Sequence, residues 1–337
     1  MWFGRKAIGQ RRIDLNSTLG ARIVHYTMEK NATIYVSNHE AIIGSAVMRC
    51  LLKNGFNNLV IRTAQELELT NQSAVFDFFK EEKPEYVVLT SIKMGGILAN
   101  NQYPAEFIYQ NIQSQSNVIQ AAWQTTVKKL LYLGSSCIYP KECPQPIKEE
   151  YLLSGKLETT SEPYAVAKIA GITMCQSYYR QYGASFIAAV PADVYGPKDD
   201  FNPETAHFLP ALMGRIHKAK IGNQDKIIVW GSGSPRRECL HVDDLADAVI
   251  FLLEEYHGSE LINIGSGKDF SIREVVLLLA NAIGFKGGIL FDSSKPDGAP
   301  RKLLDNSKIR ELGWSSKMNV NEGIQQTYKW YLEHIAS

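Results

Sequence analysis

The sequence predicts an α/β fold, in which a doubly wound parallel sheet is combined with a smaller lobe. From residue 31 onward, short apolar or β-branched runs alternate with helical segments, which is the pattern of repeated βα units. The 337 residues are 45% hydrophobic with a net charge of +1, so the chain can bury a large core. Stretches rich in Gly and Pro, at 231–235 and 295–300, indicate the loops of the smaller lobe.

The expected elements follow one another in order. Buried strands are expected from β-branched or apolar runs at residues 32–37, 58–62, 86–91, 129–135 and 185–191. Helices are expected from the segments between and after them, at residues 42–53, 73–82, 105–125, 163–182, 243–256 and 271–283. Strands that are separated by helices pair in parallel, and the helices then cover both faces of the sheet.

This order divides the chain into three parts. Residues 31–190 form a Rossmann-type domain, to which residues 226–256 return. Residues 191–225 and 257–337 form an interleaved C-terminal α/β lobe that we expect to bind the substrate. Residues 1–30 precede both as a basic N-terminal extension.

The extension differs in charge from the rest of the chain. Residues 1–30 carry +4, so the remainder carries −3. No apolar segment followed by a small-residue cleavage site is present, which argues against a secretory signal. An arm that packs on the body or on a partner subunit is one interpretation, and an organelle transit peptide is the other.

Several classes of protein are excluded by composition. A balanced charge argues against a nucleic-acid binder. The five cysteines are scattered and contain no C-x-x-C pair, so we expect reduced thiols, no disulfides and no metal site. The longest apolar run, residues 275–280, is far shorter than the ~18 residues of a membrane span. We therefore expect a cytoplasmic protein that does not bind a membrane.

Reactive side chains lie where the ligand of a doubly wound sheet binds, beyond the carboxyl ends of the strands. Ser135 and Cys137 directly follow a predicted strand, and Tyr164 and Lys168 lie four residues apart near the start of a helix. An ammonium beside a phenol favours the phenolate, and such a phenol can give a proton to a carbonyl that receives hydride. Tyr and Lys fall four apart on many helices by chance, but the pair combined with Ser135 favours a carbonyl reductase.

His207 begins another predicted helix. A lone histidine is usually structural, and that interpretation stays open here. The alternative pairs His207 with Cys137 as an acid and a base that move a proton on the carbon next to a carbonyl.

Five motifs carry a resemblance to a known family. They are L-G-S-S-C-I-Y-P-K at 133–141, E-P-Y-A-V-A-K-I-A-G at 162–171, Y-G-P at 195–197, H-V-D-D-L at 241–245 and S-K-P-D-G-A-P-R-K at 294–302. In these motifs, and in order from about residue 31 to 335, the chain resembles the GDP-L-fucose synthases, which are extended short-chain dehydrogenases/reductases.

The resemblance implies an enzyme that epimerises GDP-4-keto-6-deoxy-D-mannose at C3 and C5 and reduces its C4 ketone with NADPH. Tyr164 would donate the proton to O4, with Lys168 as its pKa partner and cofactor-ribose ligand and Ser135 as the second hydrogen bond. Cys137 and His207 would be the base and acid of the epimerisation. The resemblance also implies a homodimer, and a different partner protein is the alternative.

Contacts to the GDP-sugar are implied for residues of suitable chemistry: Arg215, Trp230, Arg237, Asp297 and Lys302. Guanidinium and ammonium groups neutralise a diphosphate, and an indole offers a flat apolar face. Two alternatives stay open. For Trp230, the alternative is a core or loop-packing aromatic. For Arg215, the alternative is a residue on a solvated helix face.

For NADP(H), the resemblance implies contacts from Asn38, Ala41, Gly44, Arg62, Ser135, Lys168, Pro191, Val194 and His207. The family's first βα turn is G-H-R-G-x-x-G, whereas residues 38–44 read N-H-E-A-I-I-G. Asn38 tolerates a left-handed backbone, but Ala41 adds a methyl group where the pyrophosphate approaches. Glu40 stands in place of an Arg that meets the 2′-phosphate, a change worth on the order of a few kcal/mol.

Three more substitutions fall in the same cleft. Ala64 replaces a second phosphate-binding Arg, for which Arg62 partly compensates. Ile92 adds bulk beside the cofactor, and Asp193 adds a carboxylate near the nicotinamide. Two hypotheses follow. The chain is a synthase with weakened or altered dinucleotide preference, or it has lost NADP(H) and acts as a redox-free epimerase or a non-catalytic subunit that binds a nucleotide sugar or another protein.

Overall fold

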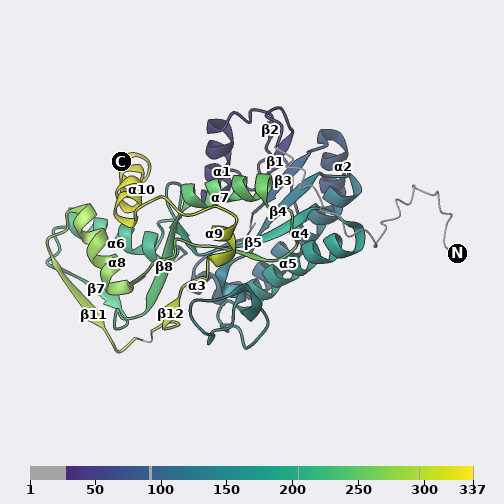
Figure 1. Ribbon diagram of the computed structural model, residues 1–337. Coiled ribbons are helices and arrows are strands. Elements are labelled where there is room, and N and C mark those ends of the chain that lie inside the picture. Colours follow the sequence, from purple (N-terminus) through teal and green to yellow (C-terminus); the bar gives the residue numbers. More distant parts are fainter. Residues whose placement is uncertain (1–27, 91–92, 204, 296, 337) are drawn as a thin grey trace, which may run out of the picture.

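The structure is a computed structural model and describes residues 28–90, 93–203, 205–295 and 297–336 (Figure 1). Its centre is a six-stranded sheet in which every neighbouring pair is parallel. In spatial order the strands are β2 (Leu59–Val60), β1 (Ile34–Val36), β3 (Tyr86–Leu89), β4 (Lys129–Leu133), β5 (Phe186–Pro191) and β9 (Ile262–Ile264). We call this the main sheet.

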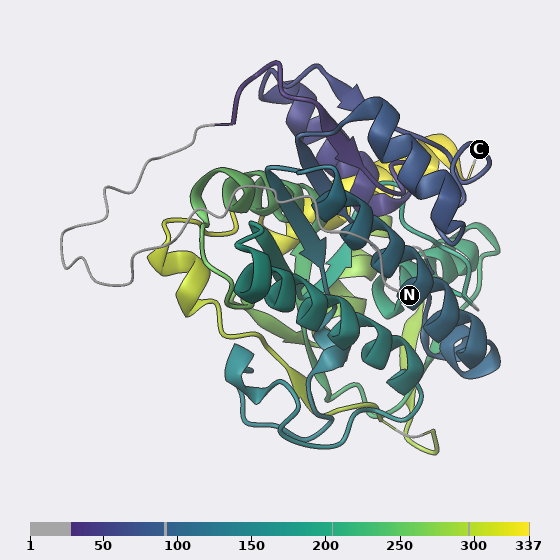
Figure 2. The ribbon, with the colours of Figure 1, turned by 90° about the vertical axis from the view of Figure 1, so that its right-hand side faces the viewer.

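Helices cover both faces of the main sheet. On one face α1 (Ile42–Lys53) packs against α7 (Val242–Glu255). The other face carries α2 (Gln72–Glu82), α4 (Pro104–Gln124) and α5 (Glu162–Tyr182), which pack side by side in that order (Figures 1 and 2). Right-handed crossovers between parallel strands produce these two layers. The short helices α3 (Ile97–Gln102), η1 (Ser136–Ile138) and η2 (Glu149–Tyr151) lie in the connections.

The smaller lobe has its own core. Helices α6 (Phe208–Ile221), α8 (Ile272–Ile283) and α10 (Val320–His334) pack together against the parallel strands β7 (Lys226–Trp230) and β11 (Gly288–Asp292). Figure 1 shows this lobe to the left of the main sheet. A second small sheet joins the two parts, with β8 (Arg236–His241) pairing with β6 (Asp193–Tyr195), β10 (Asp269–Ser271) and β12 (Arg301–Lys302). Helix α9 (Ser307–Glu311) follows β12.

The predicted fold class is confirmed: a doubly wound parallel sheet is combined with a smaller α/β lobe. Each predicted strand and helix that lies among the described residues is present, with ends that shift by a few residues. Segment 226–256, which we expected to return to the Rossmann-type domain, divides between the two parts. Its helix α7 packs on α1, whereas its strand β7 pairs with β11 in the smaller lobe.

The basic extension is outside this description as far as residue 27, as is Ile92, so the expectations for both remain untested. Among the residues described, no helix is long and apolar enough to span a membrane.

Candidate active site

Ser135 lies just beyond the carboxyl end of β4, at the centre of the main sheet. The strand ends at Leu133, and the chain then enters the helical turn η1. Ser135 precedes this turn with an extended backbone, and its hydroxyl accepts a hydrogen bond from the backbone N–H of Cys137 at 3.4 Å. The β4–η1 connection therefore places both reactive side chains predicted from the sequence at the edge where ligands bind.

Tyr164 and Lys168 lie in the first two turns of α5. The helix carries Pro163 in its first turn, where the missing N–H costs nothing, and it ends at Gly183 with a left-handed φ of +65°. Tyr164 is 8% exposed, and its ring meets that of Phe107 edge to face at 6.1 Å. This packing fixes the phenol at the edge of the cleft.

Lys168 links α5 to the end of β4. Its side chain is 1% exposed, and its ammonium donates a hydrogen bond to the carbonyl oxygen of Leu133 at 2.6 Å. The same nitrogen lies 4.5 Å from the ring centre of Tyr132 and 6.0 Å from that of Tyr164. The three residues Ser135, Tyr164 and Lys168 thus belong to one packed unit, as the sequence predicts.

Burial lowers the pKa of Lys168 to about 7, and the nearby Cys175 opposes this shift. The sequence-based expectation assumed a permanently charged ammonium beside the phenol. In the structure the charge of Lys168 instead depends on what enters the cleft, because its contacts are a carbonyl oxygen and aromatic rings. An anionic ligand beside it would restore the ammonium form.

Cys137 and His207 come from different parts of the chain. Cys137 is half-buried in η1, whereas His207 is exposed and precedes α6. The segment before His207 is tied to the loop after β3, since the N–H of Gly96 donates to the carbonyl oxygen of Thr205 at 2.7 Å. A Cβ at Gly96 would lie 2.5 Å from the carbonyl oxygen of Ala206. Within the described ranges, no hydrogen bond joins Cys137 to His207.

The first βα turn keeps the shape of a dinucleotide cradle. Asn38 has a left-handed φ of +51°, the conformation expected for it, and its carbonyl accepts from the N–H of Ala41 at 3.1 Å. A Cβ at Gly44 would overlap the carbonyl oxygen of Asn38, so only glycine lets α1 approach the turn this closely. The backbone of residues 38–44 therefore fits a pyrophosphate at the start of α1.

At the ribose end of the cradle, Glu40 and Ala64 stand where the family resemblance implies two arginines, so this end is more negative than in the family. Glu40 and Ala64 are exposed. Arg62 forms an ion pair with Glu82 of α2, and its guanidinium lies 5.4 Å from the ring centre of Phe78. The compensation that we expected from Arg62 thus meets a competing partner in Glu82.

Pro191 and Val194 lie on either side of the passage from the main sheet to the smaller lobe. Pro191 ends β5, is buried and pairs in register with Ile264. Val194 is half-buried in β6 and pairs in register with Leu240. Both positions lie next to the carboxyl edge of the main sheet, where the nicotinamide half of a dinucleotide binds in this fold.

Arg237 and Lys302 are brought together by strand register. They are partners in the parallel pair of β8 and β12, so their side chains lie on the same face of the small sheet. Arg237 donates to the carbonyl oxygen of Ala299 at 2.7 Å. Lys302 lines a small cavity of about 10 Å³ together with Ser136, Asp193, Glu238 and neighbouring apolar groups. Lys302 thus faces the segment that carries Ser135 and Cys137, and Arg237 lies beside Lys302 in the small sheet.

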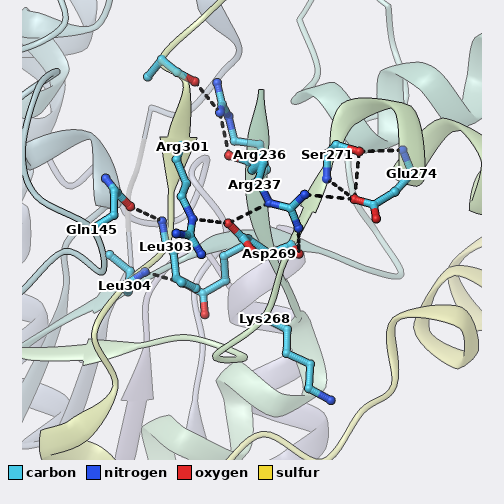
Figure 3. Close-up of polar contacts among 12 residues, drawn as sticks. Gln145, Arg236, Arg237, Lys268, Asp269, Ser271, Glu274, Arg301, Leu303 and Leu304 are labelled. Carbon is cyan, nitrogen blue, oxygen red and sulfur yellow. Dashed lines mark hydrogen bonds and ion pairs between the residues drawn. The ribbon is translucent and has the colours of Figure 1, made fainter. Parts of the chain in front are cut away.

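The preceding residues on the two strands, Arg236 and Arg301, point the other way. Figure 3 shows the carboxylate of Asp269 between the guanidinium groups of Arg236 and Arg301. Burial alone would raise the pKa of Asp269, but the hydrogen bond and charge of Arg301, with the charge of Arg236, outweigh it and lower the pKa. This ion cluster holds β8, β10 and β12 together and leaves Arg237 and Lys302 for the opposite face.

Trp230, Asp297 and Arg215 lie around strand β7 of the smaller lobe. Trp230 is 64% exposed, so it is not a core residue, and the ammonium of Lys295 lies 5.6 Å from its ring centre. Asp297 accepts hydrogen bonds from the N–H and hydroxyl of Ser232 at 2.9 and 2.6 Å, which fixes the turn after β7. Arg215 donates to the carbonyl oxygen of Ile228 and is half-buried rather than fully solvated.

Glu238 was not predicted from the sequence. It is 2% exposed, accepts from the N–H groups of Gly267 and Leu304 at 2.6 and 2.8 Å, and lines the cavity beside Lys302. Burial raises its pKa to about 7, with Asp193 adding to the effect. The one available signal was a carboxylate within the otherwise apolar and basic strand R-R-E-C-L-H.

Comparison with known proteins adds to this geometry. Residues 19–265 match the model of the NAD dependent epimerase/dehydratase family. The chain is 52% identical to GDP-L-fucose synthase 1 of Arabidopsis thaliana, over 95% of this chain and 99% of that protein. It is 48% identical to GDP-L-fucose synthase of Escherichia coli (strain K12), over 89% and 97% of the respective lengths.

A solved structure is similar over almost its whole length. It is a GDP-mannoheptose C4 reductase from Campylobacter jejuni with NADP bound, 42% identical, with a TM-score of 0.83 over 90% of this chain and 99% of that chain. Together with the family match and the two relatives, it identifies the present chain as a member of the NAD dependent epimerase/dehydratase family, in its GDP-L-fucose synthase branch.

Proposed function

We propose that the chain converts a GDP-4-keto-6-deoxy-hexose by epimerisation at C3 and C5 followed by reduction at C4, as a GDP-L-fucose synthase does. The observation that carries this proposal is the packed unit of Ser135, Tyr164 and Lys168, with Cys137 in the turn that follows Ser135. Family membership and the names of the relatives support the same activity.

For the reduction, a bound NAD(P)H supplies a hydride to C4 of the sugar. Tyr164 donates the proton that O4 needs as its negative charge develops, and the hydroxyl of Ser135 donates a second hydrogen bond to the same oxygen. Lys168, held against Leu133, stabilises the phenolate that remains on Tyr164. The packing of Tyr164 against Phe107 orients the phenol before the substrate binds.

For the epimerisation, the C4 ketone acidifies the C–H bonds at C3 and C5. The thiolate of Cys137 removes a proton from one side of the ring and becomes a thiol, and the protonated imidazole of His207 gives a proton from the other side and becomes neutral. Negative charge gathers on O4 during this exchange, so Ser135 and Tyr164 stabilise both steps. Ser135 and Tyr164 would therefore serve both steps from the carboxyl edge of the main sheet.

The GDP group would lie along the small sheet. Arg237 and Lys302 face the same side and would neutralise the diphosphate, while exposed Trp230 would stack on the base. Arg215 and Asp297 shape the same end through their contacts with β7 and the turn that follows it.

The dinucleotide would lie across the carboxyl edge of the main sheet, with its pyrophosphate at residues 38–44. NADP is the form bound in the similar Campylobacter jejuni reductase. The tight approach at Gly44 and the left-handed Asn38 support a dinucleotide at this turn despite the loss of the other glycines.

A homodimer is part of the proposal. Helices α4 and α5 present exposed apolar side chains at Tyr109, Val166 and Tyr182. Pairing of these two helices with the same pair of a second copy would bury them. Light scattering after gel filtration tests this point: a mass of twice the 37.7 kDa chain supports the dimer, and a monomer contradicts it.

Two variants separate the proposed steps. Tyr164→Phe should lose reduction of the ketone while still exchanging substrate hydrogens with heavy water at a reduced rate, because Ser135 alone then hydrogen-bonds O4. Cys137→Ser should lose that exchange, and Cys143→Ser, a half-buried thiol six residues further on, should behave as the wild type. Mass spectrometry of the sugar reports both outcomes. Reduction that survives in Tyr164→Phe, or exchange that survives in Cys137→Ser, would contradict the assigned roles.

A further inference from the structure

The ribose end of the dinucleotide cleft is defined by strand β2. This strand pairs in parallel with β1, so its carboxyl end lies beside the turn of residues 38–41. In doubly wound folds, a side chain about 20 residues after this turn decides between a ribose 2′-hydroxyl and a 2′-phosphate. An acidic residue there binds the hydroxyl and an Arg binds the phosphate. In this chain the position falls just after β2, where Arg62 lies.

Arg62 is already held by three groups of the protein. Its Nη2 pairs with the carboxylate of Glu82, its Nη1 donates to the carbonyl oxygen of Ile61 at 2.8 Å, and its guanidinium packs over Phe78. The side chains of Arg62 and Glu82 are 35% and 26% exposed, so the pair is partly screened from water. A bound 2′-phosphate would have to replace Glu82 as the partner of Arg62.

The neighbouring charges favour the same conclusion. Glu66 accepts hydrogen bonds from the N–H and hydroxyl of Thr63 at 2.8 and 3.0 Å, and these bonds lower the pKa of Glu66 and keep it ionised. Glu40 is exposed in the turn itself. Glu82 is thus paired with Arg62, the charge of Arg62 acts on Glu66, and Glu40 adds a third carboxylate on the turn beside β2. A 2′-phosphate would add about two further negative charges.

We propose that Glu82 is a specificity-determining residue, which holds Arg62 in an ion pair and thereby makes the cleft bind dinucleotides with a free 2′-hydroxyl at least as tightly as those with a 2′-phosphate. The inference rests on the proposed function, because it concerns the hydride donor of the proposed reduction. Glu82 acts through Arg62 and lies on α2, away from the reacting atoms.

The test measures binding rather than turnover. Dissociation constants for NADH and NADPH are determined by calorimetry for the wild type and for Glu82→Gln. The wild type should bind NADPH no more tightly than NADH. Glu82→Gln should bind NADPH about tenfold more tightly with its NADH affinity unchanged, because Arg62 is then free to pair with the phosphate. Glu81→Gln is the matched control, since its exposed carboxylate is the chain neighbour of Glu82 and should change neither constant.

A double-mutant cycle tests whether the gain in NADPH affinity of Glu82→Gln requires Arg62. In the wild-type background Arg62→Gln should change NADPH affinity by less than threefold, and in the Glu82→Gln background it should abolish the gain. Thermal unfolding of each variant, with and without dinucleotide, separates binding from loss of the fold.

Three results would overturn the inference: a wild type that prefers NADPH, a Glu82→Gln variant that shifts both constants equally, or a gain in NADPH affinity below threefold. Failure of the proposed reduction looks different. In that case a folded wild-type protein binds neither dinucleotide below millimolar concentration, and the inference falls with the reduction.

Discussion

The ammonium of Lys168 is bonded to the carbonyl oxygen of Leu133 at 2.6 Å, inside a core where Lys168 is 1% exposed. This bond joins the helix that carries Tyr164 to the strand that leads to Ser135. It also places an ionisable group in a medium that disfavours its charge, and burial lowers its pKa to about 7.

The stability of the protein should therefore depend on pH through Lys168. An unfolded lysine has a pKa near 10.4, so between about pH 7 and 10 the unfolded chain binds a proton that the folded chain does not. This group makes the free energy of unfolding rise with pH across that window. Relative to Lys168→Met, the wild type should gain on the order of 2 kcal/mol between pH 7 and 9. Urea unfolding at the two pH values measures the gain, and equal slopes for both proteins would refute a lowered pKa.

Gly44→Ala should impair dinucleotide binding. The new methyl group overlaps the carbonyl oxygen of Asn38, so either α1 or the turn must move. Overpacking of this kind costs about 1–3 kcal/mol, and the displaced turn should weaken NADPH or NADH binding at least tenfold. Gly288→Ala is the control, because its methyl group would have its nearest neighbours at 3.7 Å. Calorimetric affinity that is equal for the two variants would show that the turn does not cradle the pyrophosphate.

Gly96→Ala should slow epimerisation. The methyl group would press on the carbonyl oxygen of Ala206 and displace the backbone that carries His207. Displacements of about 1 Å at a catalytic group commonly cost about 100-fold in rate. We expect deuterium exchange from heavy water to fall at least tenfold. Exchange at the wild-type rate would mean that His207 does not depend on this contact.

Arg237→Gln and Lys302→Met should each weaken binding of GDP about tenfold, because each removes a cation from the same face of the small sheet. Each variant should also make GDP binding less dependent on salt. Lys268→Met is the control, since Lys268 is exposed and lies apart from the ion cluster in Figure 3. Titration calorimetry at two salt concentrations gives both quantities. Affinity that is unchanged in both variants would place the diphosphate elsewhere.

Five of the six strands of the main sheet could be predicted, because apolar runs such as residues 129–133 identify buried strands directly; β9 was not predicted. The smaller lobe offered weaker signals. Strand β7 alternates buried and exposed residues, and β12 consists of Arg301 and Lys302 alone. Such strands exist because distant partners align them, and pairing across about 65 residues leaves no local pattern in the sequence.

The candidate site likewise combines residues that a local sequence pattern locates with contacts that depend on distant parts of the chain. Ser135, Cys137, Tyr164 and Lys168 lie at the ends of elements that periodicity locates, so their chemistry could be inferred before the structure. The partnership of Arg62 with Glu82 could not, because it depends on how α2 packs beside β2. The lowered pKa of Lys168 likewise follows from burial in the finished core.

The central claim is that one site both epimerises and reduces the sugar. Its most direct test is to incubate the wild-type protein with GDP-4-keto-6-deoxy-D-mannose and reduced dinucleotide in heavy water. Each inversion should leave one solvent deuterium on carbon, and the hydride at C4 comes from the dinucleotide, so the product should be reduced and about two mass units heavier than that formed in water. An unreduced sugar that carries deuterium, or a reduced sugar without it, would contradict the account.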